Sequence, residues 1–137
     1  MVEYQFDRDE WERYLKQGNH TLKSAKSDMD EEDYDWACFK AQQSAELFLK
    51  GFLRAIGTIA TGHSITKLLS TVEEISGTVP DNIKKCSLKL DKVYIPSRYP
   101  DAYALGAPMD YYTVDDAQES IDCTEKILDF VKGLINA

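Results

Sequence analysis

Three residues in the segment RYPDAY, positions 98–103, carry side chains that suit the binding of a phosphate or a carboxylate: Arg98, Tyr99 and Tyr103. Arg98 offers a forked set of donors that matches either group, and the rings of Tyr99 and Tyr103 can stack on the guanidinium or on a nucleobase. Asp101 follows three residues after Arg98, so an ion pair that only fixes the loop is the alternative. The tyrosine rings can equally serve to cover the end of the fold. The residues alone leave these interpretations open.

Two histidines, His20 and His63, are the side chains suited to proton exchange near neutral pH. His20 lies among polar residues and is expected on the solvent side of its helix. His63 lies where a loop meets a helix, and its simplest role is a hydrogen bond to the backbone there; a catalytic role is the alternative. Lys50 is expected to be solvated or, if its helix forms a dimer face, to approach the groove around Arg98.

Several common functional motifs are absent from the sequence, including a glycine-rich phosphate loop, a GxSxG elbow and an HExxH pair. The acidic run at 28–35 fails as an EF-hand loop, because Asp33 stands where glycine must turn the chain and Phe39 stands where a bidentate glutamate belongs. We therefore expect no metal site and no cofactor.

Length and composition predict one globular domain over residues 1–137, with 43% hydrophobic and 29% charged residues. The net charge of −8 disfavours double-stranded DNA and other non-specific nucleic-acid partners, because affinity for a polyphosphate comes chiefly from displaced counterions. Contact with RNA must then be local, or depend on positive charge from a second subunit or partner. No apolar run approaches the roughly 20 residues of a membrane span, and no secretory signal opens the chain, so a cytoplasmic location is expected.

The three cysteines, Cys38, Cys86 and Cys123, are far apart, odd in number and each placed in a helical pattern. These features argue against a disulfide framework or a zinc site. We interpret all three as buried thiols.

Apolar residues recur at helical spacing along most of the chain, and no strand pattern competes with them. The predicted helices cover about 7–28, 32–56, 64 or 66 to 75, 80–93, and a last segment from Thr113. Asp7 and Pro80 are typical of helix starts. The second helix carries apolar residues on more than one face, which favours packing on two sides and suggests a dimer. The last helix is expected to turn one set of residues inward: Val114, Ala117, Ile121, Leu128, Val131 and Leu134.

Three prolines, Pro96, Pro100 and Pro108, forbid a regular helix across 95–112. A loop of this length is typically functional or disordered, and its five tyrosines, counting Tyr94, argue against disorder. The predicted fold is all-α: a four-to-five-helix bundle of mostly up-and-down type, with a long proline- and tyrosine-rich loop before the last helix.

Three stretches together resemble the HEPN domain family, the higher eukaryotes and prokaryotes nucleotide-binding domains. They are WACFKAQQSAELFLKGFL, the GH that precedes ITKLL, and VYIPSRYPDAY leading into YYTVDDAQESIDCTEKILDFV. The resemblance implies a helical bundle that commonly dimerises. Many members bind a minimal nucleotidyltransferase, and some form toxin–antitoxin pairs in which the HEPN protein is a metal-independent ribonuclease.

In the ribonuclease members an arginine is followed, after four to six residues, by a histidine. Arg98 matches the arginine, but Tyr103 stands where the histidine is expected, and no histidine follows in the chain. The resemblance thus implies phosphate binding by Arg98, whereas cleavage lacks its usual proton-transfer group, since the ordinary pKa of tyrosine is about 10. Some members are silenced when the partner adds AMP to a tyrosine beside the motif, and Tyr103 is the candidate here.

We therefore expect a homodimer that binds a nucleotide or an RNA phosphate and acts with a minimal nucleotidyltransferase. The alternatives are a metal-independent ribonuclease that uses Arg98 with Tyr103 or His63, and a purely structural protein-interaction module. The candidate binding residues are Arg98, Tyr99, Asp101, Lys50 and His63.

Overall fold

The computed structural model describes residues 6–94 and 100–137, and within these ranges it contains helices and no strand. The all-α prediction is therefore confirmed. The elements are α1 (Arg8–Asp30), α2 (Tyr34–Ala55), α3 (Ile65–Ser76), α4 (Asp81–Val93), the short 3₁₀ helices η2 (Pro100–Ala102) and η3 (Pro108–Asp110), and α5 (Val114–Ile135).

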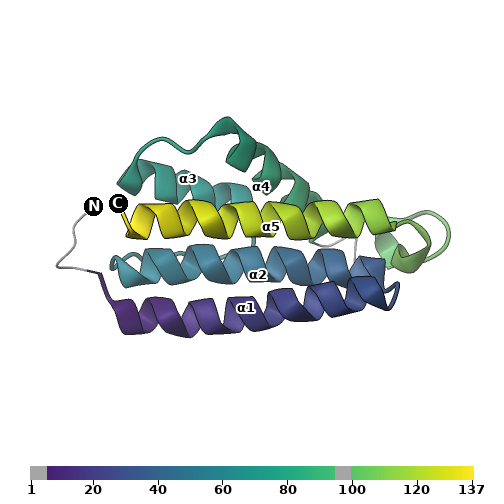
Figure 1. Ribbon diagram of the computed structural model, residues 1–137. Helices are drawn as coiled ribbons and strands as arrows, with labels where there is room; N and C mark the ends of the chain where they lie inside the picture. The colour runs from purple at the N-terminus through teal and green to yellow at the C-terminus, as the bar shows by residue number, and fades with distance from the viewer. Residues whose placement is uncertain (1–5, 95–99) are drawn as a thin grey trace.

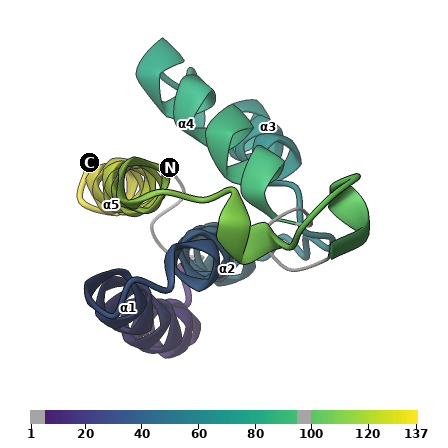
Figure 2. The same ribbon diagram turned by 90° about the vertical axis from the view of Figure 1, so that its right-hand side faces the viewer.

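The three long helices α1, α2 and α5 lie side by side, and the α3–α4 pair crosses one side of them (Figure 1). Helix α1 runs antiparallel to α2, whereas α5 runs in the same direction as α2, because α3 and α4 intervene between them. Seen from the end, α2 lies in the middle, with α1, α5 and the α3–α4 pair around it (Figure 2). No helix of the described residues is long and apolar enough to cross a membrane.

Side-chain caps fix three of the helix starts. Asp7 accepts a hydrogen bond from a backbone N–H of the first turn of α1, and Ser64 does the same for α3. Thr113 and Asp116 form a reciprocal capping box at the start of α5. The expected starts at these residues are confirmed, while Pro80 precedes α4 as its cap residue instead of being its first helical residue.

Helix α2 supplies the centre of the core. Its second half carries four large side chains with no exposed surface: Phe48, Leu49, Phe52 and Leu53. The inner face of α5 packs against it as expected, with one exception. Val114, the first residue of α5, is 48% exposed.

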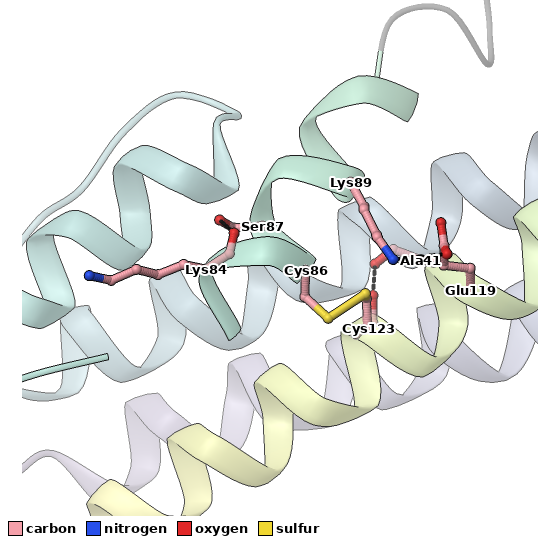
Figure 3. Close-up of a disulfide and its surroundings, with 8 residues drawn as sticks. Ala41, Lys84, Cys86, Ser87, Lys89, Glu119 and Cys123 are labelled. Carbon is pink, nitrogen blue, oxygen red and sulfur yellow. Dashed lines mark hydrogen bonds and ion pairs between the residues drawn. A yellow bond between two sulfur atoms is a disulfide. The ribbon is translucent and has the colours of Figure 1, made fainter. Parts of the chain in front are cut away.

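Two of the three cysteines contradict the prediction of free thiols. Cys86 on α4 and Cys123 on α5 form a disulfide, with their Cα atoms 5.1 Å apart (Figure 3). An ion pair between Lys89 and Glu119 joins the same two helices. The pairing arises from the packing of α4 against α5, which brings together residues 37 positions apart in sequence. Cys38 is free and buried, as expected.

The disulfide should contribute strongly to stability, because it closes a loop of 37 residues and restricts the unfolded chain. Chain entropy for a loop of this length corresponds to about 4 kcal/mol. We expect reduction to lower the melting temperature of the wild type in calorimetry. The matched control is the Cys86→Ala/Cys123→Ala double variant, which should melt at one temperature with or without reductant. An unchanged melting temperature of the wild type in reductant would contradict the disulfide.

Gly51 permits the close approach of α1 and α2. A Cβ atom at this position would overlap Cβ of Tyr14, whereas a Cβ at Gly133, near the end of α5, would meet nothing within 4 Å. Helix propensity favours alanine over glycine by about 1 kcal/mol, while overpacking costs about 1–3 kcal/mol. We therefore expect the two substitutions to change the free energy of unfolding in urea in opposite directions. Gly133→Ala should stabilise the protein and Gly51→Ala should destabilise it. Stabilisation by both substitutions would contradict the close packing of α1 on α2.

Candidate functional site

A buried carboxylate on α2 organises the candidate site. Glu46 is only 6% exposed although it is charged, and an ion that is removed from water must be paired to persist. Its Oε1 atom accepts from Nζ of Lys50 at 2.7 Å and lies 2.9 Å from Nδ1 of His63. Its Oε2 atom accepts from Nε2 of Gln43 at 3.1 Å. One carboxylate thereby holds a cation from its own helix and an imidazole from the loop that follows.

The backbone of His63 is fixed as well as its ring. Gln42, which is fully buried, donates from Nε2 to the His63 carbonyl oxygen at 2.7 Å. The next residues begin α3, where Asp91 of α4 accepts from the backbone N–H of Ile65 at 2.6 Å and from the hydroxyl of Ser64 at 3.0 Å. The loop that carries His63 is therefore held from α2 on one side and from α4 on the other.

Aromatic rings extend from this polar cluster. The His63 ring stacks on Tyr94, at the end of α4, with centroids 4.9 Å apart. Tyr94 in turn stacks on Phe39 of α2 at 5.9 Å, and Trp36 meets Phe39 edge-on at 6.1 Å. We call Trp36, Phe39, Tyr94 and His63 the aromatic row. Stacked rings of this kind give a surface on which a base can lie whatever its identity.

A groove of about 600 Å³ runs beside the cluster between α1 and α2. Phe39, Gln43 and Lys50 line it from α2, and Tyr14 and Gln17 line it from α1. The groove and the aromatic row thus share Phe39, and an extended polar ligand can contact both.

A second cluster of rings closes the end of the bundle. Tyr103 stacks on Tyr111 with centroids 4.1 Å apart, and its hydroxyl donates to that of Tyr112 at 3.0 Å. Tyr112 packs against Ala37 and Cys38 at the start of α2. Burial, followed by the hydrogen bond from Tyr103, raises the pKa of Tyr112 above its ordinary value. Burial likewise raises the pKa of Cys38 to about 11. These rings therefore cover the end of the fold, as the simpler interpretation proposed.

The structure brings two of the predicted site residues together and separates others. Lys50 and His63 meet at Glu46. The expectations of a solvated Lys50 and of a His63 side chain bonded to the backbone were wrong, because the buried carboxylate of Glu46 attracts both groups. Asp101 is exposed in η2 and Tyr103 belongs to the second cluster. Arg98 and Tyr99 lie outside the described residues, which resume at Pro100.

Sequence reasoning missed Glu46 and Gln42 as site residues. Both lie in AQQSAELFLK, where they interrupt a run of apolar and small residues on the inner side of α2. Polar residues at core positions of a helix were the available signal. His20, by contrast, is exposed on α1 as expected.

Across residues 6–94 and 100–137, no group of three or more histidine, cysteine, aspartate or glutamate side chains has the geometry to hold an ion.

Comparison with known proteins identifies the family. The family model of the HEPN domain matches residues 11–134. The chain therefore belongs to the HEPN family, and the resemblance inferred from the sequence is confirmed. No curated protein matches the sequence significantly.

Three solved structures share the fold. TT1696 from Thermus thermophilus is 43% identical, with a TM-score of 0.86 over 90% of this chain and 97% of its own. ST0689, an archaeal HEPN homologue, is also 43% identical, with a TM-score of 0.77 over 91% and 97%. An HEPN domain protein from Thermotoga maritima, TM0613, is 28% identical, with a TM-score of 0.74 over 90% and 98%.

The raised pKa of Tyr112 predicts that this tyrosine ionises at a higher pH than an ordinary tyrosine does. In the unfolded chain a tyrosine loses its proton near pH 10. Because the folded protein retains this proton to higher pH, stability should fall as pH rises above about 10. We expect Tyr112 to contribute tyrosinate absorbance only in the pH range where circular dichroism shows unfolding. This contribution is the part of the absorbance change that the substitution Tyr112→Phe removes. Tyr111→Phe changes an exposed ring of the same cluster. It should leave the high-pH ionisation of Tyr112 unchanged. Ionisation of Tyr112 in the folded protein would contradict its burial.

Proposed function

We propose that this HEPN domain is a homodimer that binds a nucleotide or an RNA phosphate in the groove around Arg98 and acts with a minimal nucleotidyltransferase, as in toxin–antitoxin pairs. The observation that carries the proposal is the aromatic row beside Lys50 and Glu46. It offers rings for a base and, at Lys50, a positive charge for a phosphate.

The sequence supports a role for Arg98 at this site, because Arg98 follows Tyr94 by four residues and Tyr94 stacks on His63.

The homodimer is proposed because members of the family commonly dimerise. Apolar side chains that a second copy could cover include Trp36, which is 46% exposed in the first turn of α2. A second copy also brings a second set of cationic groups to an otherwise acidic protein. The nucleotidyltransferase partner rests on the family alone.

A second candidate function is a metal-independent ribonuclease. The contact between His63 and Glu46 favours it, because a histidine oriented by a buried carboxylate is a common arrangement for proton transfer. In this alternative Arg98 holds the phosphate, and His63 or Tyr103 takes part in proton exchange.

Substitution of Arg98 tests the binding proposal. Hydrogen bonds from a charged group are worth about 1.5–3 kcal/mol, which is about 10- to 150-fold in affinity. We expect Arg98→Ala to weaken the binding of AMP and of a short single-stranded RNA by at least about tenfold, measured by calorimetry and fluorescence anisotropy. The matched control is Arg8→Ala, which changes an exposed arginine in the first turn of α1. Equal affinities for the wild type and Arg98→Ala, with either probe, would exclude the proposed site.

A further inference from the structure

Helix α4 is a basic helix on an acidic protein. It carries four lysines and two aspartates, whereas the whole chain has a net charge of −8. One of the aspartates, Asp91, accepts hydrogen bonds from the start of α3 and is directed toward that helix. All four lysines are exposed: Lys84, Lys85, Lys89 and Lys92. A local excess of positive charge on the outside of one helix favours an anionic partner.

An exposed leucine lies among these lysines. Leu88 has 54% of its surface in contact with water. Residues three and four positions apart are neighbours on a helix surface, so Lys84 and Lys85 lie one turn before Leu88 and Lys92 lies one turn after it. The apolar side chain therefore has cationic groups next to it in both directions along the helix.

A small apolar groove runs beside Leu88 between α3 and α4. Leu69 lines it from α3, Val79 from the connection between the two helices, and Lys84 and Leu88 from α4. Its volume of about 250 Å³ is below the roughly 300–1,000 Å³ that is usual for small-molecule sites. The groove therefore suits an apolar side chain of a partner better than a free ligand.

The two walls of this groove are held in place before any partner binds. The disulfide between Cys86 and Cys123 joins α4 to α5. Asp91 of α4 accepts from the backbone N–H of Ile65, the first residue of α3, at 2.6 Å. A surface that is already ordered loses less conformational freedom when it binds.

The lysines are available to carboxylates of a partner. Lys85 and Lys92 are exposed, and neither takes part in an ion pair within the described part of the chain. Lys84 pairs with Glu73 across the groove at 3.1 Å, but these side chains are 48% and 36% exposed. Because an exposed ion pair contributes little to stability, Lys84 can exchange Glu73 for another carboxylate at little cost.

Other anionic partners match this surface less well. Single-stranded RNA is bound by cations together with rings on which bases stack, and neither α3 nor α4 contains an aromatic residue. A helix that lies on a membrane needs a broad exposed apolar face. The apolar face of α4 is instead buried in the core, at Ile83, Cys86 and Leu90.

We propose that α3 and α4 form a docking surface for an acidic amphipathic helix of a partner protein. An apolar side chain of that helix enters the groove beside Leu88, and its carboxylates pair with Lys84, Lys85 and Lys92. Grooves between packed helices are a common setting for the recognition of such helices. The surface lies on the far side of α2 from α1 (Figure 2), so the inference goes beyond the proposed nucleotide site and does not depend on it.

Binding of defined peptides to the intact protein tests the proposal. The probe is a fluorescein-labelled peptide of about 20 residues, with leucines along one helical face and glutamates on the others. One matched peptide carries lysine in place of glutamate, and another carries serine in place of leucine. In fluorescence anisotropy we expect the acidic leucine peptide to bind and both matched peptides to bind at least about tenfold more weakly. Equal affinities for the three peptides, or no binding of the acidic leucine peptide, would overturn the proposal.

Reversal of two lysine charges tests whether the peptide binds at α4. Lys85→Glu/Lys92→Glu changes only lysines that lack an ion pair in the described chain, so no such contact is lost. We expect this variant to bind the acidic peptide about fivefold or more weakly. The matched control Lys16→Glu/Lys23→Glu makes the same change of net charge at exposed positions of α1 and should bind normally. Equal losses in the two variants would reduce the interaction to overall charge and contradict a docking site on α4.

Leu88→Ser tests the apolar contact. We expect a loss of affinity of about four- to tenfold, and no loss in the matched control Leu105→Ser, which changes a leucine that is 78% exposed between η2 and η3. Sedimentation velocity and flotation with phosphatidylglycerol vesicles identify the other occupants. If Leu88→Ser leaves peptide binding unchanged but dissociates an oligomer of the protein or abolishes vesicle binding, the occupant is a second copy or a lipid surface and the proposal is wrong.

Discussion

The rest of the site depends on the burial of one negative charge, the carboxylate of Glu46, on the innermost helix of the bundle. A carboxylate at this depth is tolerated only when hydrogen bonds and a counter-charge replace water. Lys50 and Gln43 supply these from α2 itself, and His63 supplies a third contact from the following loop. Because the buried carboxylate must be paired, the loop that carries His63 packs onto α2. Asp91 holds the next residues of the loop in the same manner, by accepting from the start of α3.

This arrangement places the rings and the cation of the candidate site together on an otherwise acidic protein. The aromatic row and Lys50 lie together, while the second cluster of tyrosines covers the end of the bundle and leaves Tyr112 half-buried. The formal charge of −8 gives no general attraction for nucleic acid. A local site with rings for a base and a few placed cations is compatible with that charge, whereas a broad basic surface is not. The HEPN fold thus provides the scaffold, and residues on α2 and its following loop form the proposed site.

Local signals in the sequence were sufficient for the helices but not for the site. Asp7 and Thr113 marked helix starts correctly, because a capping side chain acts within a few residues of itself. The disulfide between Cys86 and Cys123 was missed, since their proximity depends on how α4 packs against α5. Glu46 was missed for a related reason: helical spacing shows that a polar residue faces inward, but its partner comes from a loop whose path the spacing does not define.

The most direct test of a ligand site around Glu46 is to map the residues that respond when AMP is titrated into ¹⁵N-labelled protein. We expect the largest amide shifts at Lys50, His63 and Tyr94, and we expect these shifts to saturate together with one dissociation constant. Shifts centred instead on the apolar groove between α3 and α4, around Leu69 and Leu88, would contradict it.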